Sequence, residues 1–153
     1  MSNTKILEGN EIEEILSNQY IGRLACCLNN KPYIVPITYC YDKSTKSIIG
    51  YSGTGLKITI LKKNPNVCFE VEDIHTINDW NSVIVDGVYE ELKGADARNA
   101  VHTFVNHIRQ LLHKNSSGTT FLKDISHTEI SNETNIIYRI NIISKTGRKR
   151  TIE

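Results

Sequence analysis

Short runs of strand-forming residues, separated by turn signals, constrain the fold of this chain more than any other feature. β-Branched, aromatic and other apolar residues gather in these runs, several of which alternate with polar positions. The runs cover residues 23–28, 32–41, 48–52, 66–73, 82–92 and 135–143. Five or six short strands of this kind predict a mainly β fold, a small barrel that wraps on itself.

Helices are expected only at particular joints between these strands. Asn10 is placed to cap a short helix at 11–19, and a second short helix at 56–64 follows a glycine-rich loop. The longest helix is predicted near 96–114, because its apolar residues fall on one face. A doubly wound nucleotide-binding fold needs long helices between successive strands, and only two are available here.

Length and charge limit the classes of function. The 153 residues predict one domain, 1–153, with a polar tail from about residue 144. The 18 basic and 17 acidic side chains nearly cancel, so no overall field points to nucleic acid or to a membrane surface. No apolar run is long enough to span a membrane, and the N-terminal residues lack the order of a signal peptide, so we expect a cytoplasmic protein.

The cysteines and histidines do not form a recognisable metal or redox motif. No C-x-x-C pair is present, and the five histidines are scattered, so no metal site is predicted. Cys26 and Cys27 are adjacent, whereas Cys40 and Cys68 stand alone within apolar runs. Buried, reduced thiols are the favoured interpretation, and a redox role for Cys26 and Cys27 is the alternative.

Pro36 lies inside the second predicted strand. A proline has no N–H to donate to a neighbouring strand, so it is expected at an edge or at a bulge. The sequence therefore predicts an edge or a bulge in this strand at Pro36.

The glycine-rich loop GYSGTGLK, residues 50–57, allows two interpretations. Gly50 and Gly55 have the spacing of a nucleotide-triphosphate phosphate loop, but Leu56 occupies the lysine position of that motif. The loop amides and the following helix start could still hold an anion, with Lys57 folding back onto it. The alternative is a flexible loop with an exposed lysine.

Two further features stay open on the residues alone. Trp80, the single tryptophan, either covers a planar ligand or an interface or anchors the core at the start of a strand. The basic residues at 145–150 either contact phosphate or are simply solvated.

The order of four motifs resembles a known family. These are GRLA at 22–25, PYIVPITY at 32–39, the G-x-K of the glycine loop and NPNVCFEV at 64–71. Together they resemble the pyridoxamine 5′-phosphate oxidase-related flavoproteins, and most closely the nitroimidazole-reductase-like branch. The resemblance is close over residues 5–95, and residues 136–148 are similar to the final strand of the family.

The resemblance implies a six-stranded antiparallel split barrel of Greek-key type that forms a homodimer and binds FMN in clefts between the subunits. It places the strand from Ile34 to Tyr39 along the flavin ring. The cofactor-binding residues that it implies are Ile34, Val35, Pro36, Ile37, Thr38, Tyr39, Tyr51, Ser52, Leu56, Lys57, Trp80 and Ser82. No catalytic residue is assigned.

The chain departs from the family pattern at three places. Close relatives often carry histidine where this chain has Tyr51, and the oxidases carry arginine where it has Leu56. The C-terminal residues with which the oxidases bind their substrate are not recognisable, which argues against oxidation of pyridoxamine phosphate.

We therefore expect an FMN-dependent oxidoreductase that passes electrons from a reduced nicotinamide to a small acceptor. The alternative is a non-catalytic flavin- or haem-binding stress or storage protein, with His102, His107 or His113 as haem ligands. Nucleic-acid binding through the basic C-terminal residues is a third, weaker alternative.

Overall fold

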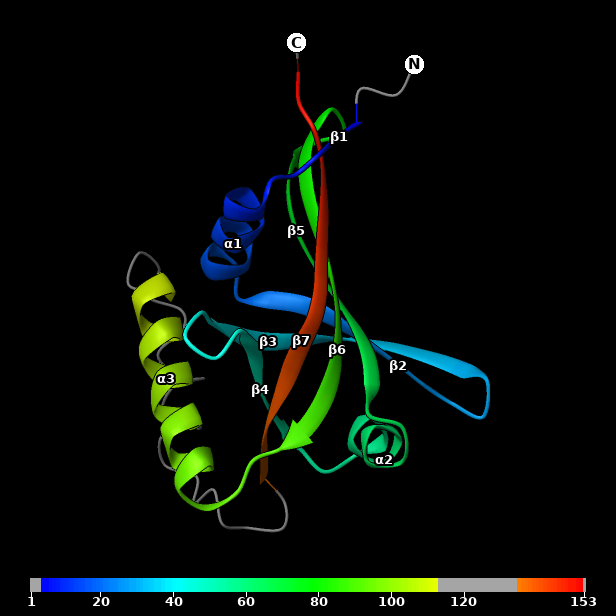
Figure 1. Ribbon diagram of the computed structural model, residues 1–153, viewed down its shortest axis with the longest axis vertical. Helices are drawn as coiled ribbons and strands as arrows, with labels where there is room; N and C mark the ends of the chain where they lie inside the picture. Colours follow the sequence, from blue (N-terminus) through cyan, green and yellow to red (C-terminus); the bar gives the residue numbers. More distant parts are fainter. Residues whose placement is uncertain (1–3, 113–134, 153) are drawn as a thin grey trace.

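The computed structural model describes residues 4–112 and 135–152. Within these ranges the chain forms seven strands and three helices (Figure 1). In chain order they are β1 (Thr4–Ile6), α1 (Gly9–Asn18), β2 (Ile21–Leu28), β3 (Lys31–Asp42), β4 (Ser47–Gly53), α2 (Leu56–Lys63), β5 (Asn66–Thr76), β6 (Asp79–Glu91), α3 (Gly94–Leu112) and β7 (Asn135–Arg150).

The strands form one antiparallel sheet that closes on itself. Its order is β1-β7-β4-β3-β2-β5-β6, and β6 also pairs with β7, which completes the ring. Six strands make the barrel, and the short β1 extends it by pairing with the end of β7. The predicted mainly β split-barrel architecture with three helices is confirmed.

The C-terminal half of β7 corrects the sequence prediction. Residues 144–150 were expected to form a polar tail, but β7 continues through them to Arg150 and pairs with β6 over this length. Backbone pairing does not require apolar side chains, so a polar run can extend a strand when a neighbouring strand is available. The residues at 113 and 114, which the prediction included in the third helix, lie outside the described residues.

The barrel interior is filled by inward-facing side chains of every barrel strand. Tyr39 and Phe69 meet there edge to face, with ring centroids 4.8 Å apart, and neither side chain is exposed. Gly22 allows this packing, because a Cβ at its position would lie 2.2 Å from the Phe69 ring. A Cβ at Gly50 would likewise lie 2.3 Å from the Tyr138 ring.

The three helices cover different parts of the barrel (Figure 1). Helix α1 contributes Ile12 and Leu16 to the barrel core, and α3 packs Phe104 and Ile108 into a second core that includes Ile49 and Ile137. Helix α2 contacts β2. The N-cap of α1 is Glu8, in a capping box with Glu11, and not the predicted Asn10, which lies within the helix.

One part of the sheet projects beyond the helices. We call it the arm, and it consists of residues 72–82, residues 146–150 and β1. The arm extends toward the two chain ends (Figure 1). Side chains alternate between its faces, and α1 binds the inner face through Lys149 with Glu11.

Candidate functional site

The pairing between β3 and β4 ends where Tyr39 faces Gly50. Beyond this point, residues 31–38 of β3 pair with β2 alone, and residues 51–53 of β4 pair with β7. We call the resulting separation of β3 from β4 the split. Pro36 lies on the unpaired edge of β3, so the edge position predicted from the sequence is confirmed.

The predicted ligand strand has two faces with different properties. Ile34 is 65% exposed, and Pro36 is also exposed, on the outer face of the sheet. Thr38 is half-buried on that same face. Apolar side chains here would suit the flat face of an aromatic ligand.

The inward-facing residues of this strand belong to the core. Val35 is half-buried against the core cluster, and Ile37 and Tyr39 are buried. The Tyr39 hydroxyl donates a hydrogen bond of 2.8 Å to the carbonyl oxygen of Leu16, and the Tyr39 N–H donates to the carbonyl oxygen of Tyr20. The hydroxyl and the backbone N–H of Tyr39 therefore both donate to groups of the protein itself.

The end of β4 and the glycine loop bring more of the predicted residues to the split. Tyr51 and Ser52 are half-buried at the end of β4, and the Ser52 hydroxyl donates to the carbonyl oxygen of Gly53. Gly55 then caps α2, and the Thr59 hydroxyl donates back to the Gly55 carbonyl oxygen at 3.1 Å. A Cβ at Gly55 would meet no atom within 4 Å, so the backbone is open to an approaching group.

Leu56 and Lys57, at the start of α2, differ in exposure. Leu56 is 60% exposed, whereas Lys57 is half-buried near Cys26. Burial lowers the pKa of the Lys57 ammonium, and its proximity to the Cys26 thiol opposes this shift. Within residues 4–112 and 135–152, no carboxylate forms an ion pair with Lys57. A half-buried cation of this kind favours an anionic ligand.

Trp80 and Ser82 are not brought to the split within one chain. They lie on β6, which is separated from β3 by β2 and β5. Three strand spacings of about 4.8 Å place them roughly 14 Å from β3 across the sheet. Both side chains are half-buried on the outer face.

Sequence reasoning missed a polar network on the outer face between β2 and β6. Arg23 forms an ion pair of 2.6 Å with Glu72, and the Ser82 hydroxyl donates to Glu70 at 3.0 Å. Burial raises the pKa of Glu70 to about 7, and the neighbouring Glu72 adds to this effect. The alternation of polar and apolar residues at 68–72 was the available signal, because it places both glutamates on one face.

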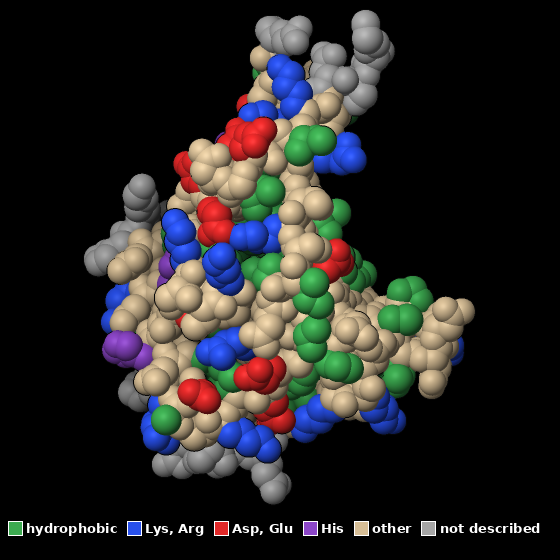
Figure 2. All heavy atoms as spheres, in the orientation of Figure 1, with side chains coloured by type: hydrophobic (Ala, Val, Ile, Leu, Met, Phe, Trp, Pro, Cys, Tyr) green, Lys and Arg blue, Asp and Glu red, His purple; other side chains and the backbone are tan. Residues whose placement is uncertain are grey.

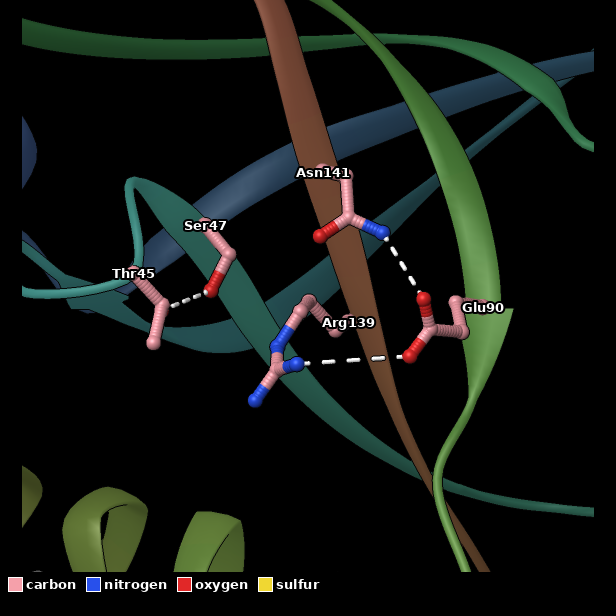
Figure 3. Close-up of polar contacts among 5 residues, drawn as sticks. All are labelled: Thr45, Ser47, Glu90, Arg139 and Asn141. Carbon is pink, nitrogen blue, oxygen red and sulfur yellow. Dashed lines mark hydrogen bonds and ion pairs between the residues drawn. The ribbon is translucent and has the colours of Figure 1, made fainter. Parts of the chain in front are cut away.

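A second polar cluster lies on β4, β6 and β7 (Figure 3). The Arg139 guanidinium lies 4.0 Å from Glu90, and the Asn141 amide donates to the same carboxylate at 3.1 Å. Ser47 is fully buried and shares a hydrogen bond with Thr45. The two contacts of Glu90 join β6 to β7, whereas the bond between Thr45 and Ser47 is local to the start of β4. None of the predicted site residues takes part.

The described thiols and histidines do not gather into a metal centre. Burial raises the pKa of Cys26, and burial also raises that of Cys40 to about 12, whereas a reactive thiol needs a lowered pKa. The four cysteines are free thiols. Among the described residues no group of histidine, cysteine and carboxylate side chains could hold a metal ion.

Two of the three histidines considered as haem ligands, His102 and His107, lie on α3. His102 is exposed and within 3.0 Å of the Asn106 side chain, and His107 is half-buried with its pKa lowered by burial. His113 lies outside the described residues.

None of the helices in the part of the chain that the structure describes has the length and apolar character needed to span a membrane.

Comparisons with known proteins identify relatives of this chain. A curated relative, an uncharacterized protein of Rhizobium meliloti, is 34% identical over 88 residues, which cover 58% of this chain and 57% of that protein. The match thus spans little more than half of that relative's length.

Solved structures resemble the chain over nearly its whole length. An FAD-binding protein from Mesorhizobium loti is 28% identical with a TM-score of 0.70, and the match covers 97% of this chain and 99% of that one. A protein from Bacteroides thetaiotaomicron, described as a 5-nitroimidazole antibiotic resistance protein, is 18% identical with a TM-score of 0.69. That match covers 98% of this chain and 91% of the other, and at this identity it shows a shared fold.

The model of the pyridoxamine 5′-phosphate oxidase family matches residues 8–149. This range includes the unpaired edge of β3, the glycine loop and most of β7. The resemblance read from the sequence motifs is confirmed, and the chain belongs to the pyridoxamine 5′-phosphate oxidase family.

Proposed function

We propose that the chain binds FMN at the split and acts as an oxidoreductase that passes electrons from a reduced nicotinamide to a small acceptor. The observation that carries the proposal is the unpaired edge of β3, and the half-buried Lys57 at the start of α2 supports it. Residues 31–38 have no second neighbouring strand, and Lys57 has no ion pair among the described residues. The FAD-binding relative from Mesorhizobium loti supports a flavin as the ligand.

The residues at the split fit the parts of a flavin nucleotide. Free backbone N–H and C=O groups of a strand edge can meet the polar edge of the ring, and the side chains of Ile34 and Pro36 offer apolar surface. Lys57 and the open backbone at Gly55 suit the phosphate. FMN, which has one terminal phosphate, matches a single half-buried lysine.

The role of the protein would be to bind and orient the reactants. When bound, the flavin supplies the electron-transfer chemistry, so no protein acid, base or nucleophile is obligatory. The β3 edge would fix the ring, and the core packing behind Ile37 and Tyr39 would hold that edge rigid. Tyr51 would border the same space, where close relatives often carry histidine.

We further propose that the working form is a homodimer in which Trp80 and Ser82 of a second copy approach the split. This arrangement would bring together the predicted residues that lie three strands apart in one chain. It would also cover exposed isoleucines of the sheet, such as Ile34 and Ile84. Hydrophobic side chains are visible over the projecting β2–β3 hairpin (Figure 2). Light scattering should give twice the chain mass at micromolar concentration, and a stable monomer would contradict this part.

The absorption spectrum of the purified protein tests the function. We expect the two visible bands of an oxidised flavin, retained through gel filtration and bleached by NADH or NADPH without oxygen. A flavin spectrum that neither nicotinamide bleaches would identify a non-catalytic flavin protein. A colourless protein that does not bind added FMN would contradict the proposal, and a Soret band would support the haem alternative.

A further inference from the structure

The outer face of the arm combines one indole with two guanidinium groups. In the antiparallel register, Trp80 on β6 faces Arg150 on β7, and Ser82 faces Arg148. Directly paired residues of antiparallel strands point to the same side of the sheet. Trp80, Arg148 and Arg150 therefore lie together on one face.

The charge of this face is not compensated by the described residues. Neither Arg148 nor Arg150 forms an ion pair within residues 4–112 and 135–152, and Arg148 is exposed. The nearest carboxylate along the row of Arg148 and Ser82 is Glu72, which Arg23 already binds at 2.6 Å. Two arginines thus remain available to an external anion.

The alternate residues of the same strand behave differently. Lys145 and Lys149 point to the inner face, where Glu13 and Glu11 of α1 bind them. Helix α1 occupies that side only, and Leu7 and Ile12 pack against Gly147 there. Among residues 4–112 and 135–152, no helix lies on the outer face of the arm, and the exposed isoleucines Ile6 and Ile74 flank this face.

We propose that the outer face of the arm is a subsite for the adenosine phosphate half of a dinucleotide. Trp80, which would border the split of the other copy in the proposed homodimer, would stack on the adenine ring of a dinucleotide that extends from that split, and Arg148 and Arg150 would bind phosphate oxygens through their planar N–H groups. The Ser82 hydroxyl donates to Glu70 and is not assigned a role in this subsite. The biological role of this subsite rests on the proposed flavin oxidoreductase function, whereas the subsite itself consists of residues of the arm.

Two dinucleotides share this chemistry. One is the reduced nicotinamide donor, whose adenosine half carries phosphates, and the other is FAD, which adds an adenosine phosphate to FMN. A long nucleic acid is a poorer match, because the chain has a net charge of only +1 and the face offers two free arginines.

Tryptophan fluorescence is a direct probe, because Trp80 is the single tryptophan. We would titrate the protein as purified with adenosine 5′-diphosphate and with adenosine. The diphosphate should quench Trp80 and bind at least about ten-fold more tightly than the nucleoside, because only it engages the arginines. Arg148→Ala and Arg150→Ala should each weaken the diphosphate about ten-fold and leave adenosine unchanged. Arg98→Ala, an exposed arginine on α3, is the matched control.

Titrations with NADPH and with FAD show which dinucleotide uses the subsite. If the donor uses the subsite, NADPH should quench Trp80 in FMN-loaded protein, and its KM should rise in Arg148→Ala. If FAD is the source, the protein should prefer FAD over FMN about ten-fold, and the arginine variants should abolish that preference. Arg148→Lys keeps the charge but loses the planar pair of N–H donors of the guanidinium. Its affinity for the diphosphate should lie between those of wild type and Arg148→Ala.

The inference is overturned if diphosphate and adenosine bind equally, or if the arginine variants and Arg98→Ala behave alike. An oligonucleotide that binds the face more tightly than any dinucleotide would also overturn it. Retention of FMN is measured on the same samples by absorbance. A failure of the proposed flavin site would therefore appear as lost FMN absorbance, separately from the quenching of Trp80 that tests the arm.

Discussion

Lys145 and Lys149 on one side of β7, and Arg148 and Arg150 on the other, lie within one stretch of six residues but have different partners. The two lysines are bound by glutamates of α1, whereas the two arginines have no ion pair among the described residues. The difference comes from what covers each face of the sheet. When a basic run forms a strand, alternate residues therefore face opposite sides. Those on one side form ion pairs within the protein, and those on the other can bind an external ligand.

The same division extends across the neighbouring strands. The inner face carries Phe69, Val71 and Val83, all fully buried. The outer face of the same strands carries Glu70, Glu72 and Ser82, and Ile84 is 44% exposed there. We therefore expect inner-face changes to alter stability and outer-face changes to alter binding.

The largest contrast is expected at Phe69 and Ile84. Phe69→Ala removes an unexposed ring that packs against Tyr39, and should lower the free energy of unfolding by about 3–5 kcal/mol. Ile84→Ala removes a side chain that is already 44% exposed and should cost only about 1 kcal/mol. Urea denaturation of both variants measures the difference, and equal losses would contradict the division.

Adjacent positions on β7 offer a second contrast. A Cβ at Gly147 would lie 2.7 Å from Leu7 Cδ1 and 3.1 Å from Ile12 Cγ1, so Gly147→Val should destabilise the protein by about 1–3 kcal/mol through overpacking. Thr146→Val, on the exposed outer face, should change the stability by less than about 0.5 kcal/mol. Thermal unfolding followed by circular dichroism distinguishes them, and a stable Gly147→Val would show that α1 is loosely held.

The cations of β7 should differ by a smaller amount. Burial disfavours ionised Glu13, but the contributions of Lys145, Tyr41 and Lys43 together outweigh burial and lower the pKa of the carboxyl. Lys145→Met should cost about 1 kcal/mol at pH 7, and Arg148→Met less than about 0.5 kcal/mol. Because the pKa of Glu13 is lowered in the folded state, the cost of Lys145→Met should shrink as the pH falls below 4.5. Urea denaturation at pH 7 and pH 3.5 checks both statements, and a cost that stays the same at the two pH values would exclude this ion pair as its origin.

The smallest expected effect is the contribution of Glu70 to the pH dependence of stability. Its pKa of about 7 in the folded protein exceeds the ordinary 4.5, so between these values the folded state holds the proton that the unfolded state has released. Stability should therefore fall as the pH rises from 5 to 7. Glu70→Gln should flatten this decline by less than about 1 kcal/mol, because the site is partly solvated. Glu14→Gln, an exposed carboxyl on α1, is the control. Parallel pH curves for wild type and Glu70→Gln would contradict the assignment.

The sequence predicted the barrel because strand runs, turns and helix faces are local signals. Pro36 also predicted an edge correctly, since a missing N–H is a property of one residue. The end of β7 was predicted wrongly, because its pairing depends on β6, which is distant in the sequence. The N-cap of α1 was also wrong, since Glu8 and Glu11 cap it jointly.

The candidate site was predictable only in part. Motif order predicted that the β3 edge, Tyr51, Ser52 and Lys57 share one site; the strand pairing places Tyr51 and Ser52 where β4 leaves β3, and the shared site stays a prediction. Trp80 and Ser82 were assigned to the same site, yet they lie three strands away within one chain. The network of Arg23, Glu70 and Glu72 was missed because it depends on strand register.

The central claim is that the split binds a flavin phosphate through Lys57. Fluorescence titrations of FMN and riboflavin into wild type and Lys57→Met test it most directly, with the exposed Lys63→Met at the end of α2 as a control. We expect Lys57→Met to weaken FMN about ten- to thirty-fold, or 1–2 kcal/mol, and to leave riboflavin, which has no phosphate, nearly unchanged. Unchanged FMN affinity in Lys57→Met would contradict the claim and assign the loop a purely structural role.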